Sequence, residues 1–265
     1  MDSVQRNVLV YDTEETLIQT VAARLLLRIS DLLTAQERVD VALTGGTDGI
    51  AVLAAAAQSP LCAAVDFSRV HFWWGDERFV PADHADRNAL QAREAWLDAL
   101  VASGELPEEN IHEMPAETRT AEAAASASDA ENDAVLLAAA REYQAELERE
   151  LGPEGTLDIA LFGVGPDGHF ASLFPGHDEV LSSDPAVKSL GVAHSPKMPP
   201  LRVTLTVPFI QSTDFVWVFA SGERKSDAVG RALYEADHAN VPSSYARGKE
   251  ESLWMIDRAA AANLA

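Results

Sequence analysis

The chain has 265 residues, of which 47% are hydrophobic and 23% are charged, and its formal net charge is −22 at pH 7. This length and apolar content suit a folded chain with a sizeable core and exclude wholesale disorder, so we expect one domain spanning residues 1–265. The excess of acidic side chains argues against nucleic acid or an anionic membrane surface as a partner.

Cysteine content and apolar runs restrict the class of protein further. The single cysteine, Cys62, excludes an intrachain disulfide and a cysteine-based metal cluster. No apolar run reaches the length of a membrane span, and the first residues lack the basic-then-apolar pattern of a signal peptide. We therefore expect a cytoplasmic protein without a membrane partner.

Apolar periodicity predicts strands that alternate with helices along the whole chain. Strands are predicted at residues 7–11, 39–43, 70–74, 157–162, 203–207, 215–220 and 253–256, and those at 157–162 and 215–220 are expected to be buried. Helices are predicted after a cap at Asp12 or Thr13, at residues 50–57, 90–100 and 135–151, and after Lys225 and Asp257. Residues 117–134 are expected to be a solvated loop or a frayed helix. The alternation predicts an α/β fold with a largely parallel sheet covered by helices on both faces.

A glycine-rich loop connects the second predicted strand to its helix. The loop contains Gly45, Gly46 and Thr47, and a strand, a glycine-rich loop and a helix N-terminus together can present backbone N–H groups to a phosphate. The loop matches neither a Walker motif nor the dinucleotide fingerprint. A tight turn that binds nothing is an equally good interpretation of this loop alone.

Charged side chains follow the third predicted strand, where Asp76 and Arg78 fall at the carboxyl edge of the sheet. Ligands bind at this edge in α/β proteins, although a self-neutralising ion pair is the alternative explanation. His84 lies in a loop further on, and no second histidine stands at ligand spacing from it. We therefore identify no metal-binding residues.

The stretch after the strand at residues 157–162 carries the strongest signal for catalysis. Gly163 and Gly165 break the strand, and Asp167 and His169 follow with one glycine between them. A carboxylate can orient an imidazole and stabilise its charged form, which makes a general base usable near neutral pH. A surface turn in which both residues are only turn formers is the alternative at this point.

Three cations near strand ends or helix starts stand out in a chain that has only 20 lysines and arginines. They are Lys197, Arg202 and Lys225. Each alone is typical of a solvated surface, but together they can balance the charge of a phosphate group.

Taken in order, these segments resemble one family. The matching stretches are residues 44–47, 72–78 with Asp86 and Asn88, 163–176, 202–206 and 222–225. They resemble the 6-phosphogluconolactonase family over most of the chain, and the stretch from Asp167 to Gly176 is the most specific. The resemblance implies a Rossmann-like fold shared with glucosamine-6-phosphate deaminases and ribose-5-phosphate isomerases. It also implies hydrolysis of 6-phospho-D-glucono-1,5-lactone with no metal and no cofactor.

We expect His169 to be the base that activates water, with Asp167 orienting its imidazole or a substrate hydroxyl. Arg78 is expected to contact the oxyanion or the sugar, and Asp76 to orient Arg78. By resemblance, the substrate-binding residues are Gly45, Gly46, Thr47, Lys197, Arg202 and Lys225. The family pattern departs at Asp48, which is expected to point away from the phosphate loop. The only partner implied is a small sugar phosphate, and a monomer is favoured.

Three rival functions compete with this interpretation. Resemblance to the aminosugar deaminase predicts a carboxylate five residues beyond the histidine, where this chain has Phe174. A non-catalytic sugar-phosphate sensor of a transcription regulator is disfavoured by the net charge, by the short segment before the first strand and by the Asp167 and His169 pair. A serine esterase would need an elbow motif around Ser172, which is instead expected to cap or pack a helix.

Overall fold

The computed structural model describes residues 6–234 and 238–264. Its centre is a six-stranded sheet in the order β1-β9-β8-β5-β2-β3. The strands are β1 (Arg6–Tyr11), β2 (Val39–Leu43), β3 (Val70–Trp74), β5 (Ile159–Gly163), β8 (Phe215–Ala220) and β9 (Glu251–Asp257). Every neighbouring pair is parallel, so all carboxyl ends meet at one edge of the sheet.

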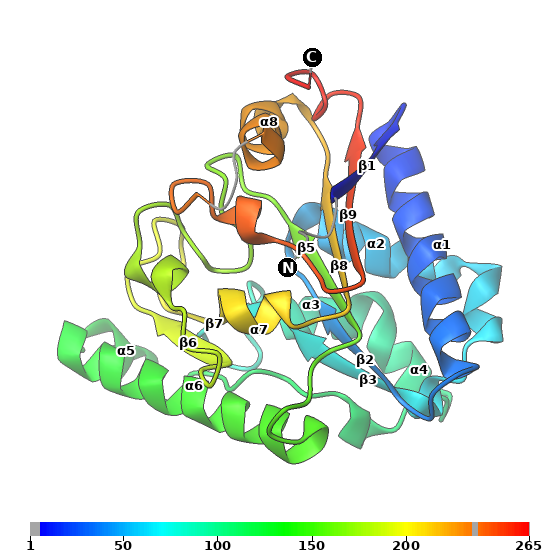
Figure 1. The fold of residues 1–265 in the computed structure, drawn as a ribbon. Helices are drawn as coiled ribbons and strands as arrows, with labels where there is room; N and C mark the ends of the chain where they lie inside the picture. Colours follow the sequence, from blue (N-terminus) through cyan, green and yellow to red (C-terminus); the bar gives the residue numbers. More distant parts are fainter. Residues whose placement is uncertain (1–5, 235–237, 265) are drawn as a thin grey trace.

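Helices cover both faces of this sheet, and α1 and α6 lie on opposite sides of it (Figure 1). The helices are α1 (Glu14–Leu33), α2 (Gly46–Gln58), α3 (Asn88–Ala92), α4 (Asp98–Ala102), α5 (Ala121–Ala125), α6 (Asp129–Leu151), α7 (Val207–Gln211) and α8 (Ser226–Tyr234). A π-helical segment (Arg93–Leu97) joins α3 to α4. The predicted α/β class with a covered parallel sheet is confirmed.

Local sequence explains the first helix directly. The Thr13 side chain accepts a hydrogen bond from the backbone N–H of Thr16, which caps α1 as predicted. The apolar residues at helical spacing, Leu17, Val21 and Leu25 among them, are all buried against the core. Strand β2 is buried along its whole length, because it lies between β5 and β3 with both faces covered.

A second sheet, which the sequence did not predict, lies beside the first. It is antiparallel, in the order β4-β7-β6, and contains β4 (Asp76–Arg78), β7 (Arg202–Leu205) and β6 (Ser189–Val192). Strand β7 overlaps the strand predicted at residues 203–207, whereas β4 and β6, with three and four residues, were not predicted because they are too short for a period-two pattern to be recognised. This small sheet turns the charged residues after β3 into an ordered strand.

Several predicted boundaries were wrong. Helix α2 begins at Gly46, although its start was predicted at residue 50. Helix α6 begins at Asp129, inside the stretch expected to be a solvated loop or a frayed helix, because Ser128 and Glu131 form a reciprocal capping box. The strand expected to reach Val207 ends at Leu205, since Thr206 caps α7. The helix expected after Asp257 is absent from the described residues, and residues 258–263 form turns there.

A buried carboxylate joins β4 to α3. Glu77 is fully inaccessible to solvent and accepts hydrogen bonds from the backbone N–H groups of Arg78, Asn88 and Ala89 at 2.7–2.8 Å. Burial raises the pKa of Glu77 to about 7, although the charge of Arg87 and the three backbone donors oppose the rise. The first turn of α3 is therefore fixed to β4 through one side chain.

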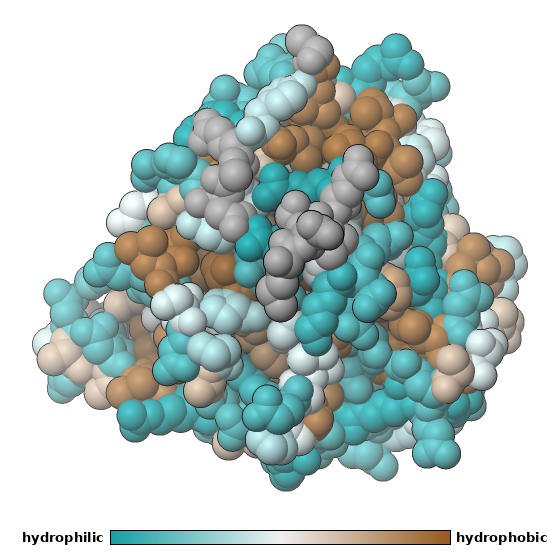
Figure 2. Space-filling view, viewed as in Figure 1, coloured by the Kyte–Doolittle hydropathy of each residue, from teal (hydrophilic) through white to brown (hydrophobic). Residues whose placement is uncertain are grey.

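The surface agrees with the acidic composition. Hydrophilic residues cover most of the face seen in Figure 2, and the hydrophobic residues are broken into separate patches. None of the helices in the part of the chain that the structure describes is long and apolar enough to cross a membrane.

We predict that the Glu77→Gln variant separates the pH dependence of Glu77 from that of the other groups. An unfolded glutamate loses its proton near pH 4.5, whereas native Glu77 keeps its proton up to about pH 7. Raising the pH between these values therefore favours the unfolded chain. The difference in unfolding free energy between wild type and variant should shrink by on the order of 2 kcal/mol from pH 5 to pH 8, measured by urea denaturation. A difference that stays constant with pH would contradict this assignment.

Candidate active site

One pocket lies over the carboxyl ends of β2, β3 and β5. Nine of the ten site residues predicted from the sequence line it, namely Gly45, Gly46, Thr47, Asp76, Arg78, His169, Lys197, Arg202 and Lys225. The tenth, Asp167, is hydrogen-bonded to the pocket residue His169. Segments that follow β2, β3, β5 and β8 meet here because parallel strands end at the same edge, and residues 197–202 join them from the loop before β7 and its first residue.

Asp167, His169 and Lys197 form a compact group in the pocket wall. The Asp167 Oδ1 atom lies 2.5 Å from His169 Nδ1, and the Lys197 Nζ atom lies 3.2 Å from both of these atoms. Burial alone would raise the pKa of Asp167, but the hydrogen bond and charge of His169 together with Lys197 hold that pKa well below its usual range. The ionised carboxylate accepts from Nδ1–H, which leaves the lone pair of Nε2 available as a base.

Glycine is required where the loop after β5 folds beneath this histidine. A Cβ atom at Gly165 would lie 2.0 Å from the His169 ring and 2.5 Å from Asp167 Oδ1. The backbone N–H of Gly165 donates to the carbonyl of His169, and Gly168 has a φ of 90° that favours glycine. On the other side, the ring of Phe174 lies 4.8 Å from the imidazole. The loop therefore fixes the direction of His169 through its backbone and its packing.

Asp76 does not orient Arg78 as the sequence suggested. Its Oδ2 atom accepts from the Ser172 hydroxyl at 2.6 Å, while Arg78 Nη1 donates to the backbone carbonyl of Asp86 at 2.7 Å. Ser172 also begins no helix, because residues 171–172 form a turn in which Ala171 has a φ of 48°. Asp76 thus ties the loop after β5 to the small sheet.

Two arginines face each other across the small sheet. Arg78 of β4 is the direct register partner of Arg202 of β7. Burial and the charge of Arg78 lower the pKa of Arg202 to about 10. Like charges directly opposite each other in a strand pair repel. An anion in the pocket would relieve that repulsion, so this pair favours a negatively charged ligand.

The amino end of α2 provides a second anion-binding element. Its N-cap, Gly45, offers no side chain to the free backbone N–H groups of the first turn. Asp48 was expected to point away, but it is buried in the pocket wall and lies 2.7 Å from Lys225 Nζ. The Oδ1 atom of Asp48 accepts a hydrogen bond from the Ser221 hydroxyl at 2.8 Å. Asp48 therefore holds the ammonium group of Lys225 beside the N-terminus of α2.

Several further pocket residues were not identified as site residues from the sequence, among them Asn88, Phe174 and Met198. The Asn88 side chain donates to the Asp76 carbonyl at 2.9 Å, and its Oδ1 atom has no hydrogen-bond partner among the described residues. The only sequence signal for Asn88 was its place, with Asp86, behind the family-matching stretch at residues 72–78.

Sequence comparisons with a family model and with known proteins agree on one family. The family model described as glucosamine-6-phosphate isomerases/6-phosphogluconolactonase matches residues 12–254. The 6-phosphogluconolactonase of Streptomyces coelicolor is 39% identical over 262 residues, which cover 97% of this chain and 94% of that protein. The protein of the same name from Mycobacterium tuberculosis is 38% identical, covering 96% of this chain and 97% of its own.

Solved structures share the fold over nearly the whole chain. The 6-phosphogluconolactonase of Trypanosoma brucei superposes with a TM-score of 0.78 at 25% identity, covering 99% of this chain and 100% of its own. A monomeric glucosamine-6-phosphate deaminase superposes with a TM-score of 0.72 at 18% identity, covering 97% and 99%. The deaminase match is evidence of a common fold only.

We predict that Gly165→Ala displaces the imidazole of His169. The new methyl group would overlap the His169 ring, which must retreat by about 1 Å or more and leave its contact with Asp167. Gly163→Ala is the matched control, because a Cβ atom there meets nothing within 4 Å. Crystal structures of both variants test this expectation. An imidazole that stays on Asp167 in the Gly165→Ala variant would contradict it.

Proposed function

The chain belongs to the glucosamine-6-phosphate isomerase/6-phosphogluconolactonase family, and we propose that it hydrolyses 6-phospho-D-glucono-1,5-lactone to 6-phospho-D-gluconate. This is the lactone-opening step of the oxidative pentose phosphate pathway. Relatives named 6-phosphogluconolactonase at 38–39% identity support the proposal. The observation that carries it within the structure is the Asp167, His169 and Lys197 group in a pocket lined by cations.

The proposed mechanism uses His169 first as a base and then as an acid. Its Nε2 atom removes a proton from water while the water oxygen bonds to C1 of the lactone, and the carbonyl electrons move to the oxyanion. The oxyanion then re-forms the carbonyl, the bond from C1 to the ring oxygen breaks, and His169 returns the proton to that oxygen. Asp167 holds the imidazole in the tautomer that these two proton transfers require.

Arg78 and Lys197 supply positive charge around the reacting carbon. Lys197 was assigned to the phosphate from the sequence, but its Nζ atom lies at the Asp167 and His169 pair. There it can offset the charge that develops during attack. Arg78 extends into the same pocket from β4 and is proposed to contact the oxyanion or the sugar.

The 6-phosphate is proposed to bind at the N-terminus of α2 with Lys225 and Arg202. The backbone N–H groups of Gly46 and Thr47 and the helix dipole favour an anion at this place. Asp48 positions Lys225 for the same anion. A phosphate here also reduces the repulsion between Arg202 and its register partner across the small sheet.

The related deaminase reaction has no support from the site. Phe174 occupies the position at which the deaminase pattern predicts a carboxylate, and it packs 4.8 Å from the His169 ring. An aromatic ring cannot carry the proton that ring opening and transfer at C2 require. Glucosamine 6-phosphate should therefore release no ammonia in the presence of this protein.

We predict that His169→Ala lowers kcat for lactone hydrolysis by roughly 10²–10⁴-fold, which is the usual contribution of a general base. Loss of freshly generated lactone should be followed with wild type, variant and buffer alone, since the lactone also opens spontaneously. His194→Ala is the control, because His194 is an exposed histidine outside the pocket lining.

This experiment tests the role of His169 and the lactonase activity separately. A folded His169→Ala variant that stays fully active would place the base elsewhere while leaving the lactonase proposal intact. Wild type that merely matches buffer would overturn the lactonase proposal itself.

A second prediction concerns the phosphate. The double variant Asp48→Asn/Lys225→Met removes the proposed phosphate contact without leaving Asp48 as an unpaired buried charge. KM for the phosphorylated lactone should rise about 10–100-fold, as expected for the loss of one charge-assisted hydrogen bond, with a smaller effect on kcat. Rates with unphosphorylated gluconolactone should change little.

Lys249→Met is the matched control, since Lys249 pairs with Asp214 just before the amino end of β8, at the opposite edge of the sheet. If KM of the double variant rises equally for both lactones, Asp48 and Lys225 do not recognise the phosphate.

A further inference from the structure

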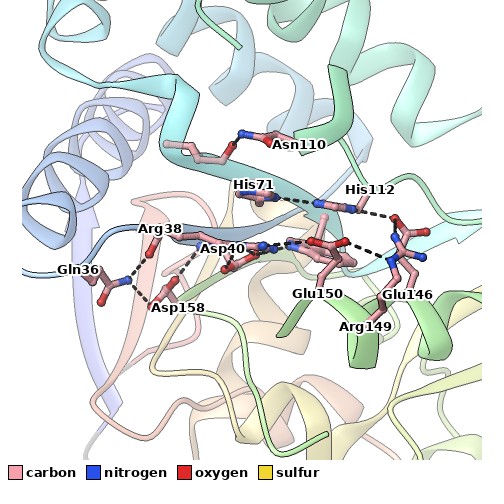
Figure 3. Close-up of polar contacts among 12 residues, drawn as sticks. Gln36, Arg38, Asp40, His71, Asn110, His112, Glu146, Arg149, Glu150 and Asp158 are labelled. Carbon is pink, nitrogen blue, oxygen red and sulfur yellow. Dashed lines mark hydrogen bonds and ion pairs between the residues drawn. The ribbon is translucent and has the colours of Figure 1, made fainter. Parts of the chain in front are cut away.

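A second polar cluster lies at the amino edge of the sheet, away from the pocket (Figure 3). His71 is the second residue of β3, and Glu146 and Glu150 lie in the last two turns of α6. His112 belongs to the segment that follows α4 and hydrogen-bonds through its backbone N–H to the carbonyl of Phe72. The pocket begins beyond the other end of β3, at about 13 Å of strand length from His71.

His112 is held rigidly with one ring nitrogen directed at His71. Its Nδ1 atom lies 2.8 Å from Glu146 Oε1, and its Nε2 atom lies 2.9 Å from His71 Nδ1. The ring stacks on Trp73 at 3.9 Å between centroids and is almost completely buried. Because the carboxylate accepts the proton on Nδ1, the lone pair of His112 is on Nε2.

We propose that His71, His112 and Glu150 form a binding site for one divalent transition-metal ion of the Zn²⁺ type. A nitrogen of each histidine and a carboxylate oxygen of Glu150 all lie within 4.8 Å of one another. Two imidazoles and one carboxylate are a donor set that suits zinc and its neighbours, whereas Mg²⁺ and Ca²⁺ prefer oxygen ligands alone.

The geometry requires only a small adjustment. Ligand atoms about 2.0–2.1 Å from a tetrahedral ion lie about 3.4 Å apart, so the two imidazole nitrogens must separate by about 0.5 Å. Glu150 must approach them and loosen its ion pairs with Arg38 and Arg149, and its side chain is partly exposed on the last turn of α6. The ion takes the place of the hydrogen between the rings, and His71 then carries its proton on Nε2.

Glu146 serves as a positioning residue for this site. Metal-bound histidines usually donate their second N–H to a carboxylate, which fixes the ring and strengthens the ligand. The bond between Glu146 and His112 is this arrangement, formed here without any contribution from Glu150.

The charges around the cluster also accept a cation. Arg38 and Arg149 both contact Glu150, at 3.1 Å and 3.2 Å. Asp40, Glu146 and Glu150 supply three carboxylates against these two cations, and Arg38 is already paired with Asp40 at 2.7 Å. Glu150 can therefore turn to the metal while Arg38 keeps its other partner.

A metal ion bound by these three residues would link the end of α6 to β3 and to the segment that carries His112. The reacting groups lie at the other edge of the sheet, so the ion would stabilise the fold and leave the chemistry unchanged. The experiment uses the full chain, treated with a chelator and dialysed. Zn²⁺ binding is measured by calorimetry, and Co²⁺ serves as a visible spectroscopic probe of imidazole coordination.

Wild type should bind one ion, which raises Tm and gives Co²⁺ absorption bands. Glu146→Gln should weaken binding about 10–100-fold, and Glu150→Gln and His71→Asn at least as much. His194→Ala and His169→Ala should bind as wild type does. Glu150 is partly exposed, so Glu150→Gln is expected to fold even where His71→Asn does not. Failure of wild type to bind at micromolar Zn²⁺, or loss of binding in the His169 variant instead, would overturn the proposal.

Discussion

The architecture of the pocket depends on a single buried carboxylate. Glu77 gathers three backbone N–H groups from two separate elements, and it does so without contact with solvent. Burying a carboxyl group without hydrogen-bond partners is costly, so these three backbone donors stabilise the packing of β4 against α3. Asp76 and Arg78, its neighbours on β4, line the pocket, and Asn88 at the start of α3 packs directly against Gly45, where a Cβ atom would lie 1.8 Å from Asn88 Oδ1.

The parallel sheet then divides the molecule into two chemically different edges. At the carboxyl ends, backbone N–H groups, a helix N-terminus and several cations meet around one histidine, which suits an anionic substrate. At the amino ends, imidazoles and carboxylates meet instead, which suits a cation. In a chain with a net charge of −22, Arg78, Lys197, Arg202 and Lys225 are gathered around this one pocket.

Much of this could be predicted from the sequence, and the failures have physical causes. The alternation of strands and helices and the glycine-rich loops depend on local patterns, so the fold class and the loops that form the pocket were predicted. Strand β7 of the small sheet was predicted, but β4 and β6 were missed because they are too short to show a pattern, so the sheet itself was not predicted. The direction of Asp48 and the bond of Ser172 to Asp76 depend on distant partners.

The cluster of His71, His112, Glu146 and Glu150 at the amino edge of the sheet could not be predicted from the sequence, because it too depends on partners that are distant along the chain. His71 and His112 are 41 residues apart and share no motif spacing, and only the pairing of β3 with the segment after α4 brings their rings together. Sequence spacing identifies metal ligands when they lie on one helix or one loop. It says nothing about ligands that tertiary packing assembles.

The most direct test of the account is a crystal structure of the wild-type protein with 6-phosphogluconate bound. The account predicts the phosphate at the N-terminus of α2, in contact with Lys225 and Arg202, and the C1 carboxylate within hydrogen-bond distance of His169 Nε2. A product bound in the reverse direction, with its phosphate against His169, would contradict the assignment of the two ends. A product bound outside this pocket would contradict the site as a whole.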